Sequence, residues 1–421
     1  MGRLPFIIAA CIFITAFDLY FFSAIISSFK KWKPATKKVF SIAYWLYSVF
    51  LIIGVFCGIY LNLILTLRAI ILVAFFLTVA CKFVMLPFLI VDDIRRGWIK
   101  LQRYLSKSKV KNQSESKPTL ATEAPISRSS FLVKAGLITA AVPLTSLSWG
   151  IVSGAYDYTI RRVNLILPNL PAAFDGITLG QISDIHAGSF YNKTAVMGGV
   201  EMLMKEKPDF IFFTGDLVNN LTKEVRDYQE MFSKVKAPLG VFSSLGNHDY
   251  GDYYFGAQSS PAKVKNLEDM VTVHKQMGYN LLRNENRRLK VNGEEIGILG
   301  VENWGMGRFP KYGRMEPTIK NTDDLPVKLL LSHDPSHWRA QIIPQYPQID
   351  AMFSGHTHGM QFGLRFKEIQ WSPIQYIYKE WAGLYREKHQ QLYVNVGYGF
   401  LGYPGRVGIV PEITIFTLKR A

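Results

Sequence analysis

Two histidines separated by one residue, His356 and His358, stand directly after the mostly apolar run 349–353. Residues i and i+2 of an extended segment point to the same side, so both imidazole rings can face one point beyond the end of a strand. Imidazole nitrogens are common metal ligands. On its own this pair is a weak indicator of a metal site, since core or surface histidines often show the same spacing.

Four earlier apolar runs of strand length are also followed by a possible metal ligand, which is His, Asp or Asn. These residues are Asp184 and His186 after 177–182, Asp216 after 210–213, Asn247 and His248 after 241–245, and His333 after 329–332. Five of the eight histidines in the chain lie at such run ends. Because α/β domains place functional side chains in loops at strand ends, we expect these residues to converge on one site.

The runs belong to a region in which short apolar segments alternate with helix-like segments. We expect strands at 164–169, 177–182, 209–213, 240–245, 296–301, 328–332, 349–353, 391–396 and 412–418, and helices at 193–206, 223–235 and 264–277. Several strands are apolar throughout, as in a sheet that is covered on both faces. The pattern predicts an α/β layered domain over 160–421, with its site at the carboxyl ends of the strands.

The N-terminal part has the composition of a membrane region. Apolar stretches of spanning length at 4–28, 40–61 and 69–91 predict three transmembrane helices within 1–104. Asp18 and Lys82 are charged residues within these stretches. Because an unpaired charge is unfavourable in lipid, we expect Asp18 to face another helix near Lys82, to line a polar site, or to reach the membrane interface.

A polar segment and a fourth apolar segment follow. Residues 105–130 are rich in Ser, Lys, Pro, Thr and Glu and predict an exposed linker. The segment 131–153 is either an anchor on the membrane surface or a fourth transmembrane helix, and we favour spanning because basic residues precede it and its length suffices. Basic residues place 30–38 and 95–111 in the cytoplasm, so a spanning fourth helix puts the domain behind it outside.

The positions of the charged residues and cysteines limit which binding partners and which metal ligands are expected. Residues 1–150 hold 18 Lys and Arg against 5 Asp and Glu, a net charge of +13 out of +16 for the chain. The basic excess therefore belongs to the membrane part, and a nucleic-acid partner is disfavoured. Cys11, Cys57 and Cys81 all lie in the apolar stretches, so the C-terminal domain offers no thiolate ligand.

The motifs together resemble the signature of the calcineurin-like metallophosphoesterases. They are Asp184-x-His186, Gly215-Asp216, Gly246-Asn247-His248-Asp249, His333 and Gly355-His356-Thr357-His358, in that order. The resemblance covers residues 160–418, and Leu167-Pro168 and the segment 411–414 are similar to the membrane-anchored YkuE- and YaeI-type branch. It implies a layered β-sandwich flanked by helices, which an all-α transmembrane region precedes here.

The family pattern implies a site with two divalent metal ions. It puts one metal on Asp184, His186, Asp216 and His358, and the other on Asp216, Asn247, His333 and His356. This mixture of nitrogen and oxygen donors suits Mn, Fe or Zn better than Ca. The ions would activate a hydroxide for in-line attack on phosphorus.

The resemblance also implies roles around the metals. It makes His248 the proton donor to the leaving oxygen, and a nearby acid, Asp184 or Asp249, would favour its protonated form. Arg406 matches an arginine in the closing segment of the family and would contact a phosphate, or else form a structural ion pair. Met360 stands where many branch members carry a second glycine, which affects the shape of the loop next to the ligands.

These inferences predict a membrane-anchored phosphoesterase that hydrolyses a phosphodiester or pyrophosphate bond. We expect a phosphorylated lipid or small-molecule substrate at the bilayer, such as UDP-2,3-diacylglucosamine, with which some members of the branch are associated. The alternatives are a broad-specificity phosphatase for nucleotides or phosphoproteins, and a non-catalytic metal-binding scaffold. The expected location is the bacterial inner (cytoplasmic) membrane, with the catalytic domain outside the cytoplasm.

Overall fold

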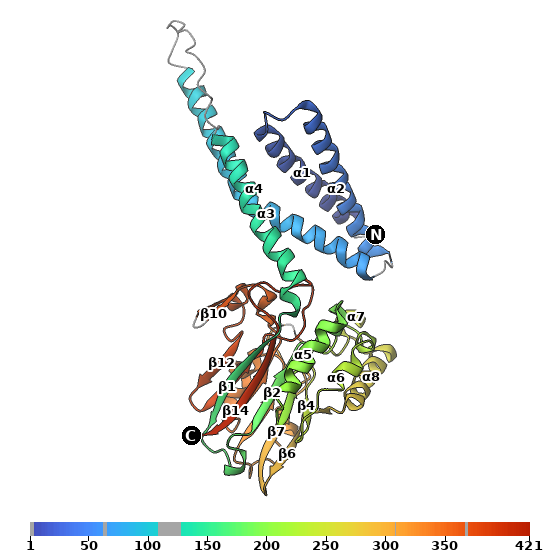
Figure 1. The fold of residues 1–421 in the computed structure, drawn as a ribbon, viewed down its shortest axis with the longest axis vertical. Coiled ribbons are helices and arrows are strands. Elements are labelled where there is room, and N and C mark those ends of the chain that lie inside the picture. The colour runs from blue at the N-terminus through green and yellow to red at the C-terminus, as the bar shows by residue number, and fades with distance from the viewer. Residues whose placement is uncertain (1–3, 62–64, 108–127, 308, 367–368) are drawn as a thin grey trace. The chain divides into compact units, whose positions relative to one another are not determined.

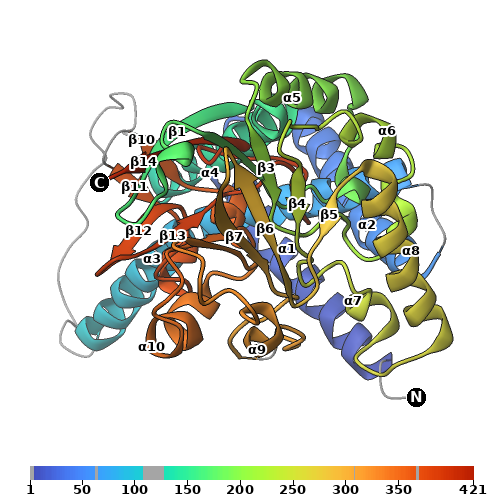
Figure 2. The same cartoon turned by 90° about the horizontal axis from the view of Figure 1, so that it is seen from below.

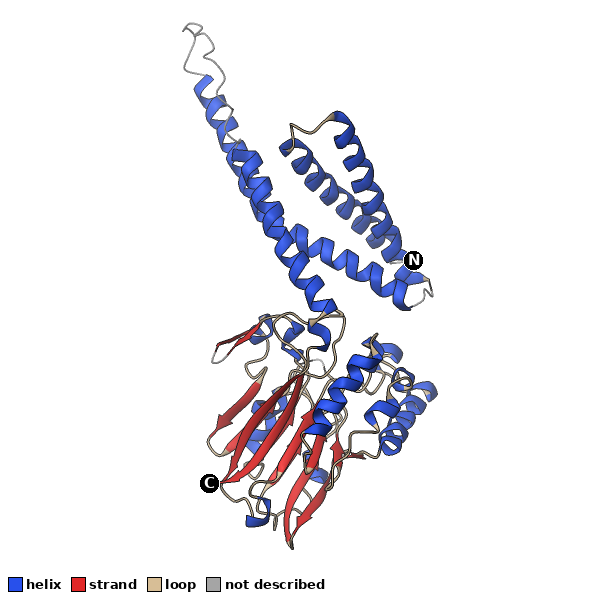
Figure 3. Ribbon diagram, viewed as in Figure 1, coloured by secondary structure: helices blue, strands red, loops and turns tan. Residues whose placement is uncertain are grey.

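The computed structural model describes residues 4–61, 65–107, 128–307, 309–366 and 369–421. The chain divides into two compact units, residues 1–148 and residues 149–421. The first unit is helical, whereas the second combines strands with helices (Figure 3). The linker expected at 105–130 falls largely on 108–127, which lie outside the described residues.

The first unit consists of long apolar helices (Figure 1). They are α1 (Leu4–Ser28), α2 (Pro34–Tyr60), α3 (Leu65–Lys107) and α4 (Arg128–Val152), whose last turn belongs to the second unit. All four are long and apolar enough to cross a membrane. α3 continues past the expected end at residue 91 because Asp92 forms ion pairs with Arg95 and Arg96 across one helical turn, which supports further helix.

The charged pair of the first unit joins three helices. Lys82 on α3 and Ser48 on α2 both contact the carboxylate of Asp18 on α1, and all three side chains are largely withdrawn from the surface. Tyr44 also donates a hydrogen bond to the Asp18 carbonyl at 3.1 Å. These groups border a cavity of about 280 Å³ that is lined mainly by aromatic and aliphatic side chains. The expected proximity of Asp18 and Lys82 is confirmed.

Two six-stranded sheets form the centre of the second unit. The first has the order β1-β14-β2-β3-β4-β5 and the second the order β12-β13-β9-β8-β7-β6. The strands of the first sheet are β1 (Thr159–Leu167), β2 (Thr178–Ile182), β3 (Phe210–Phe213), β4 (Val241–Ser243), β5 (Asn280–Leu281) and β14 (Glu412–Arg420). Those of the second are β6 (Glu285–Val291), β7 (Glu294–Gly300), β8 (Lys328–Leu331), β9 (Ala351–Ser354), β12 (Gly383–Glu387) and β13 (Gln390–Val394). A separate hairpin pairs β10 (Leu364–Phe366) with β11 (Ile369–Trp371).

The sheets lie face to face with helices outside them (Figure 2). Alternation along β3 shows how the layers form: Phe210 and Phe212 enter the core between the sheets, whereas Ile211 and Phe213 enter the core under the helices. The helices beside the first sheet are α5 (Lys193–Lys205), α6 (Gln229–Phe232) and α8 (Pro261–Met277). Beside the second lie α9 (Met315–Thr318) and α10 (Ile343–Gln345). The predicted layered β-sandwich flanked by helices is confirmed.

Two expected elements differ from the structure. The helix expected at 223–235 is instead two short turns, Thr222–Val225 and Gln229–Phe232. Tyr228 leaves the helical conformation between them, with φ −121°, and its hydroxyl donates to the Phe190 carbonyl at 3.0 Å. β1 begins at Thr159 rather than 164 because its first residues pair in parallel with β14.

Candidate metal centre

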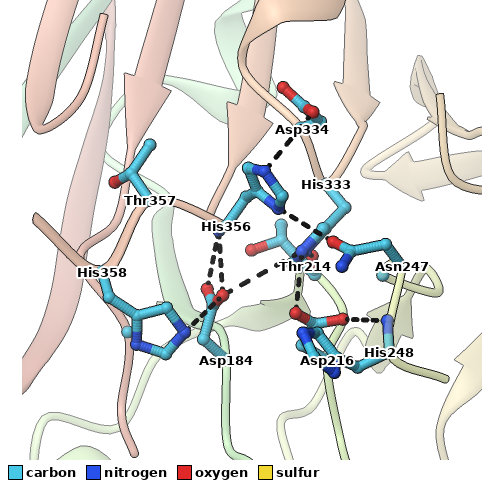
Figure 4. A network of polar contacts seen from close by, with 12 residues as sticks. Asp184, Thr214, Asp216, Asn247, His248, His333, Asp334, His356, Thr357 and His358 are labelled. Atoms are coloured by element: carbon cyan, nitrogen blue, oxygen red, sulfur yellow. Dashed lines mark hydrogen bonds and ion pairs between the residues drawn. The ribbon is translucent and has the colours of Figure 1, made fainter. Parts of the chain in front are cut away.

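The candidate ligands come from loops that follow parallel strands. β2, β3 and β4 run parallel in the first sheet, and β8 and β9 run parallel in the second. Their carboxyl ends meet at one place, where the side chains predicted from the sequence gather (Figure 4). They are Asp184 and His186 after β2, Asp216 after β3, Asn247 and His248 after β4, His333 after β8, and His356 and His358 after β9.

One group of possible metal ligands contains Asp184, His186 and His358. The Nε2 atoms of His186 and His358 lie 3.0 Å apart, and His358 Nε2 lies 3.2 Å from Asp184 Oδ1. All three side chains are buried. Three donor atoms therefore converge on one point in the interior.

A second group contains Asp216, His333 and His356. Asp216 Oδ2 lies 3.1 Å from His333 Nε2 and 3.5 Å from His186 Nε2, so this carboxylate stands between the two groups. Asn247 joins the second group, with its Oδ1 2.8 Å from His356 Nδ1. The arrangement is suited to two cations that share Asp216.

A buried ring nitrogen and the donor set show that the site fits metal ions. His333 Nε2, which faces the carboxylate of Asp216, is buried without a hydrogen bond of good geometry among the described residues. Such atoms are rare in proteins, and a buried polar atom without a partner is destabilising. The donor set of imidazole nitrogens, carboxylates and one amide oxygen is typical of transition-metal sites. A cation between His333 Nε2 and the facing carboxylates would satisfy this atom.

Burial and charge set the protonation of the ligands. Burial opposes ionisation of Asp184 and Asp216, but the neighbouring histidines hold the pKa of both carboxyls below the usual range. Burial lowers the pKa of His186 to about 3, so its ring is neutral at neutral pH. His333 is buried too, but Asp216 and Asp184 raise its pKa to about 10. A protonated His333 thus supplies positive charge that a bound cation would supply instead.

The backbone of the candidate ligands is strained. Five of them, Asp184, His186, Asp216, His356 and His358, have φ between 50° and 74°. Non-glycine residues seldom adopt this left-handed region, and strained backbone clusters at functional sites. These turns direct side chains at the ends of several strands toward one point.

Two glycines allow the loops to approach closely. A Cβ atom on Gly355 would collide with the carboxylate of Asp184, and one on Gly246 would collide with the carboxylate of Asp216. The glycines of these motifs are therefore required by space around the two carboxylates.

The loop after His358 accommodates the departure from the usual motif. Met360 has φ 54°, the conformation that glycine adopts without strain, and its side chain is exposed. Gln361, the next residue, is buried and donates to the carbonyls of Tyr403 and Gly405 at 2.7 and 2.9 Å. His358, two residues before Met360, lies in the first group of possible metal ligands.

His248 lies at the edge of the site with one ring nitrogen available. Its Nδ1 is 2.6 Å from the carbonyl of Asn219, which makes Nδ1 the N–H donor of the neutral ring and leaves Nε2 free to exchange a proton. Its main-chain N–H donates to Asp216 Oδ1 at 2.9 Å. The expectation that Asp184 or Asp249 favours protonated His248 stays a prediction, and the Asp249 carboxylate accepts from the main-chain N–H groups of Asp216 and Leu217.

Main-chain carbonyl groups hold the side chain of Arg406. Its guanidinium is fully buried and donates to the main-chain carbonyls of Val396, Gly399 and Ile409. Carbonyl oxygens hold it, and the described residues form no ion pair with it, whereas the contact with a phosphate stays a prediction. Arg406 fixes the loop behind His358, whose Nδ1 is 3.3 Å away.

Three further side chains surround the second group. Tyr378 Oη lies 2.8 Å from His356 Nε2, and Asp334 Oδ2 lies 3.5 Å from the same atom. Tyr253 accepts a hydrogen bond from Asn247 Nδ2 at 2.9 Å, and its ring lies beside that of His248. Asp334 follows His333 directly in the sequence, so its place near the metal centre could have been predicted. The sequence gives no such signal for Tyr378, which lies 22 residues after His356.

Comparisons with known proteins agree with the geometry. A family described as "Calcineurin-like phosphoesterase" matches residues 177–360, and one described as "Probable Calcineurin-like phosphoesterase, transmembrane domain" matches residues 3–155. The chain is 32% identical to the metallophosphoesterase YkuE of Bacillus subtilis over 59% of this chain and 82% of that protein. It is 28% identical to the zebrafish (Danio rerio) transmembrane protein with metallophosphoesterase domain, over 65% of this chain and 60% of that protein.

A solved structure of sulfate thiohydrolase SoxB from Thermus thermophilus is also similar. It is 10% identical with a TM-score of 0.35, over 59% of this chain and 57% of that chain, so this likeness carries no argument about the reaction. The two family matches cover the helical part and the strand-end motifs. The match to the Bacillus relative covers most of the length of that protein. The chain therefore belongs to the calcineurin-like metallophosphoesterases and is a membrane protein with a phosphoesterase domain.

Proposed function

We propose that this metal-dependent phosphoesterase hydrolyses a phosphodiester or pyrophosphate bond of a lipid-linked substrate at the membrane surface. One ion would be held by Asp184, His186, Asp216 and His358, and the other by Asp216, Asn247, His333 and His356. Bound Mn, Fe or Zn ions supply Lewis acidity toward phosphoryl oxygens and acidify a water molecule.

The residues of the chain itself complete the reaction. His248 holds a proton on Nε2 when it is charged and gives it to the leaving oxygen, while its Nδ1–H stays bound to Asn219. Asp216 fixes the position of His248 through the main-chain N–H. The ring of Tyr253 packs beside the imidazole, with 4.5 Å between the ring centroids.

The attachment of α4 to the catalytic domain carries the proposal of a membrane substrate. The apolar span reaches Tyr156, and β1 begins at Thr159. The last turn of α4 is built into the domain, since the Gly150 carbonyl accepts from Arg406 N at 3.1 Å and the Ile151 carbonyl accepts from Tyr191 Oη at 2.6 Å. A short tether keeps the site at high effective concentration near lipid headgroups, whereas a soluble metabolite gains nothing from it.

We propose the same orientation as the sequence predicts, with the catalytic domain outside the cytoplasm of a bacterial cell. The basic residues of 30–38 and of 95–103 support it by the positive-inside rule. Protease treatment of intact spheroplasts tests it. Digestion of the domain without lysis is the expected result, and protection until lysis would place the domain in the cytoplasm.

The reaction is tested with full-length protein in detergent with added Mn. Its rate on UDP-2,3-diacylglucosamine is compared with its rate on a soluble aryl phosphodiester, beside an Asp216→Asn control. Faster lipid cleavage that the control abolishes is the expected result. Turnover of the soluble ester alone would favour a broad-specificity phosphatase, and no turnover of either with Mn, Fe or Zn would favour a scaffold.

A further inference from the structure

The hairpin of β10 and β11 has one apolar face. In its register Leu364 is opposite Trp371 and Phe366 is opposite Ile369. Directly opposed residues share a face, as do residues two apart on one strand, so all four side chains point to the same side. Each is between 41% and 63% exposed. Four large, exposed apolar side chains thus lie on one face of the hairpin.

The other side of the hairpin is attached to the domain. Arg365 lies between Leu364 and Phe366 on the strand and points the opposite way. Its guanidinium forms an ion pair with Glu412 of β14, which is buried and also accepts from Tyr393 Oη at 2.6 Å. The ion pair holds the hairpin with its apolar face outward.

Exposed apolar residues also flank the hairpin in the chain, and the ring of Phe362 lies 6.5 Å from that of Trp371. Met360 and Phe362 precede the hairpin, and Tyr376 and Ile377 follow it, with the last two more than 70% exposed. Eight of the exposed large apolar residues of this unit therefore fall between residues 360 and 377. A cluster of this kind marks an interaction surface, whereas singly scattered exposed apolar residues do not.

Hydrogen bonds connect this surface to the end of α4. Val407 N donates to the Gln361 carbonyl at 2.8 Å, and Gly363 N donates to the Val407 carbonyl at 2.9 Å. The neighbouring Arg406 N donates to the carbonyl of Gly150 in the last turn of α4. In that turn Trp149 and Val152 are also exposed. The apolar surface is therefore one loop away from the end of a helix that is apolar enough to span a membrane.

We propose that the apolar face of the β10–β11 hairpin, with its flanking residues, docks on the bilayer that α4 enters. Trp, Tyr and Phe are the side chains favoured at the membrane interface, and Trp371, Tyr376 and Phe366 supply them here. The surface also borders the candidate metal centre, since Ile377 precedes Tyr378, the residue in contact with His356. If the proposed function holds, docking brings a lipid headgroup to the metals while its chains stay in the bilayer.

The position of the hairpin is tested without turnover. Full-length protein with Cys11, Cys57 and Cys81 replaced by alanine receives a single NBD fluorophore at Ile369→Cys. The matched control carries it at Lys290→Cys on β6, at the other end of the same unit (Figure 1). Both proteins are reconstituted in vesicles of phosphatidylcholine and phosphatidylglycerol, and hydrolysis of a soluble aryl phosphodiester verifies the fold.

The measurement is the quenching of NBD fluorescence by doxyl-labelled lipid and by aqueous iodide. Docking predicts lipid quenching at position 369 at least about threefold stronger than at 290, with iodide quenching correspondingly weaker. Equal iodide quenching at both positions would show a surface open to water and overturn the proposal. Protection at 369 from both quenchers would show a protein contact, such as a second copy, and would also overturn it.

A second variant links the contact to the apolar side chains. Leu364→Ser with Phe366→Ser should move iodide quenching at position 369 toward the value at 290, whereas Val264→Ser, an exposed apolar site on α8, should not. Unchanged quenching in the hairpin variant would refute the role of this face. Normal docking without cleavage of any lipid would refute the proposed substrate alone, so the two failures are distinguishable.

Discussion

Asp249 offers the sharpest test of how the bridging carboxylate is positioned. Its Oδ2 accepts from the main-chain N–H groups of Asp216 and Gly246, both at 2.9 Å. Its Oδ1 accepts from those of Leu217 and Val218, at 2.8 and 3.3 Å. Asp249→Asn keeps the shape but replaces one oxygen by an NH₂ group. Whichever way the amide turns, two buried N–H donors then face another donor.

The four hydrogen bonds to Asp249 set the expected loss of stability and of metal affinity in Asp249→Asn. A buried donor without an acceptor is destabilising by about 1–3 kcal/mol, so two of them give roughly 2–6 kcal/mol. For a domain of this size that lowers the unfolding midpoint by roughly 5–20 °C. Because the turn of Asp216 loses its support, the affinity for metal should fall about 10- to 100-fold, as for other groups that orient ligands.

Two measurements check this prediction. Thermal unfolding is followed by tryptophan fluorescence, and the Mn concentration for half-maximal hydrolysis of a soluble aryl phosphodiester is determined. Burial and the charge of Asp216 raise the pKa of Asp249 to about 7, so both are made at pH 8.5, where the carboxylate is ionised. Asp323→Asn, in an exposed loop, is the control. If both variants have the same midpoint and Mn requirement, Asp249 does not hold the Asp216 turn.

Three further predictions concern the proton donor, the membrane pair and a buried histidine. His248→Gln should lower kcat about 10²- to 10⁴-fold on an alkyl phosphodiester but far less on an aryl ester, whose leaving group needs no proton; equal losses on both substrates would contradict the role. Asp18→Leu leaves the charge of Lys82 unpaired and should destabilise the first unit by about 3–5 kcal/mol, measured by thermal unfolding in detergent. The double variant that adds Lys82→Leu should regain this stability, because no unpaired charge remains. Burial lowers the pKa of His274 from 6.5 to about 3, so the unfolded chain binds a proton that the folded chain does not, and stability is lost as the pH falls from 6.5 toward 3. That loss is about 1.4 kcal/mol per pH unit, and a His274→Gln variant whose unfolding midpoint depends on pH as the parent's does would contradict it.

The candidate ligands could be predicted because their signal is local. Each follows a short apolar strand within a few residues, and in parallel strands the carboxyl ends necessarily lie at one edge of a sheet. The layered architecture followed from the family resemblance of those same motifs. By contrast, the contact of Tyr378 with His356 depends on how the intervening hairpin turns back, which no pattern in the sequence specifies.

The hairpin itself was missed although its strand had a signal. Phe362, Leu364 and Phe366 alternate with other residues, which is typical of a strand with one apolar face. Alternation does not reveal what covers that face, since a core and a bilayer both select apolar side chains. The contact of Arg365 with Glu412 shows only that the apolar face points away from the domain, because it turns the charged side toward the domain. That contact joins residues 47 positions apart and is visible only in the fold.

The left-handed backbone of the ligands explains why the metal centre needs the whole sandwich around it. Each such residue is destabilising by about 1–3 kcal/mol, and glycine would relieve the strain but remove the ligand. The surroundings must therefore hold the turns, and they do so with main-chain hydrogen bonds between the strand ends: Asp184 N donates to the Gly215 carbonyl, His186 N to that of Asp216, and Gly355 N to that of His333. These bonds join loops within each sheet, and two further bonds join the sheets to each other: His356 N donates to Asp184 Oδ1 at 2.9 Å, and Tyr398 N donates to the Ser183 carbonyl at 2.7 Å. A substitution that separates the sheets should consequently disable the metal site before it unfolds the domain.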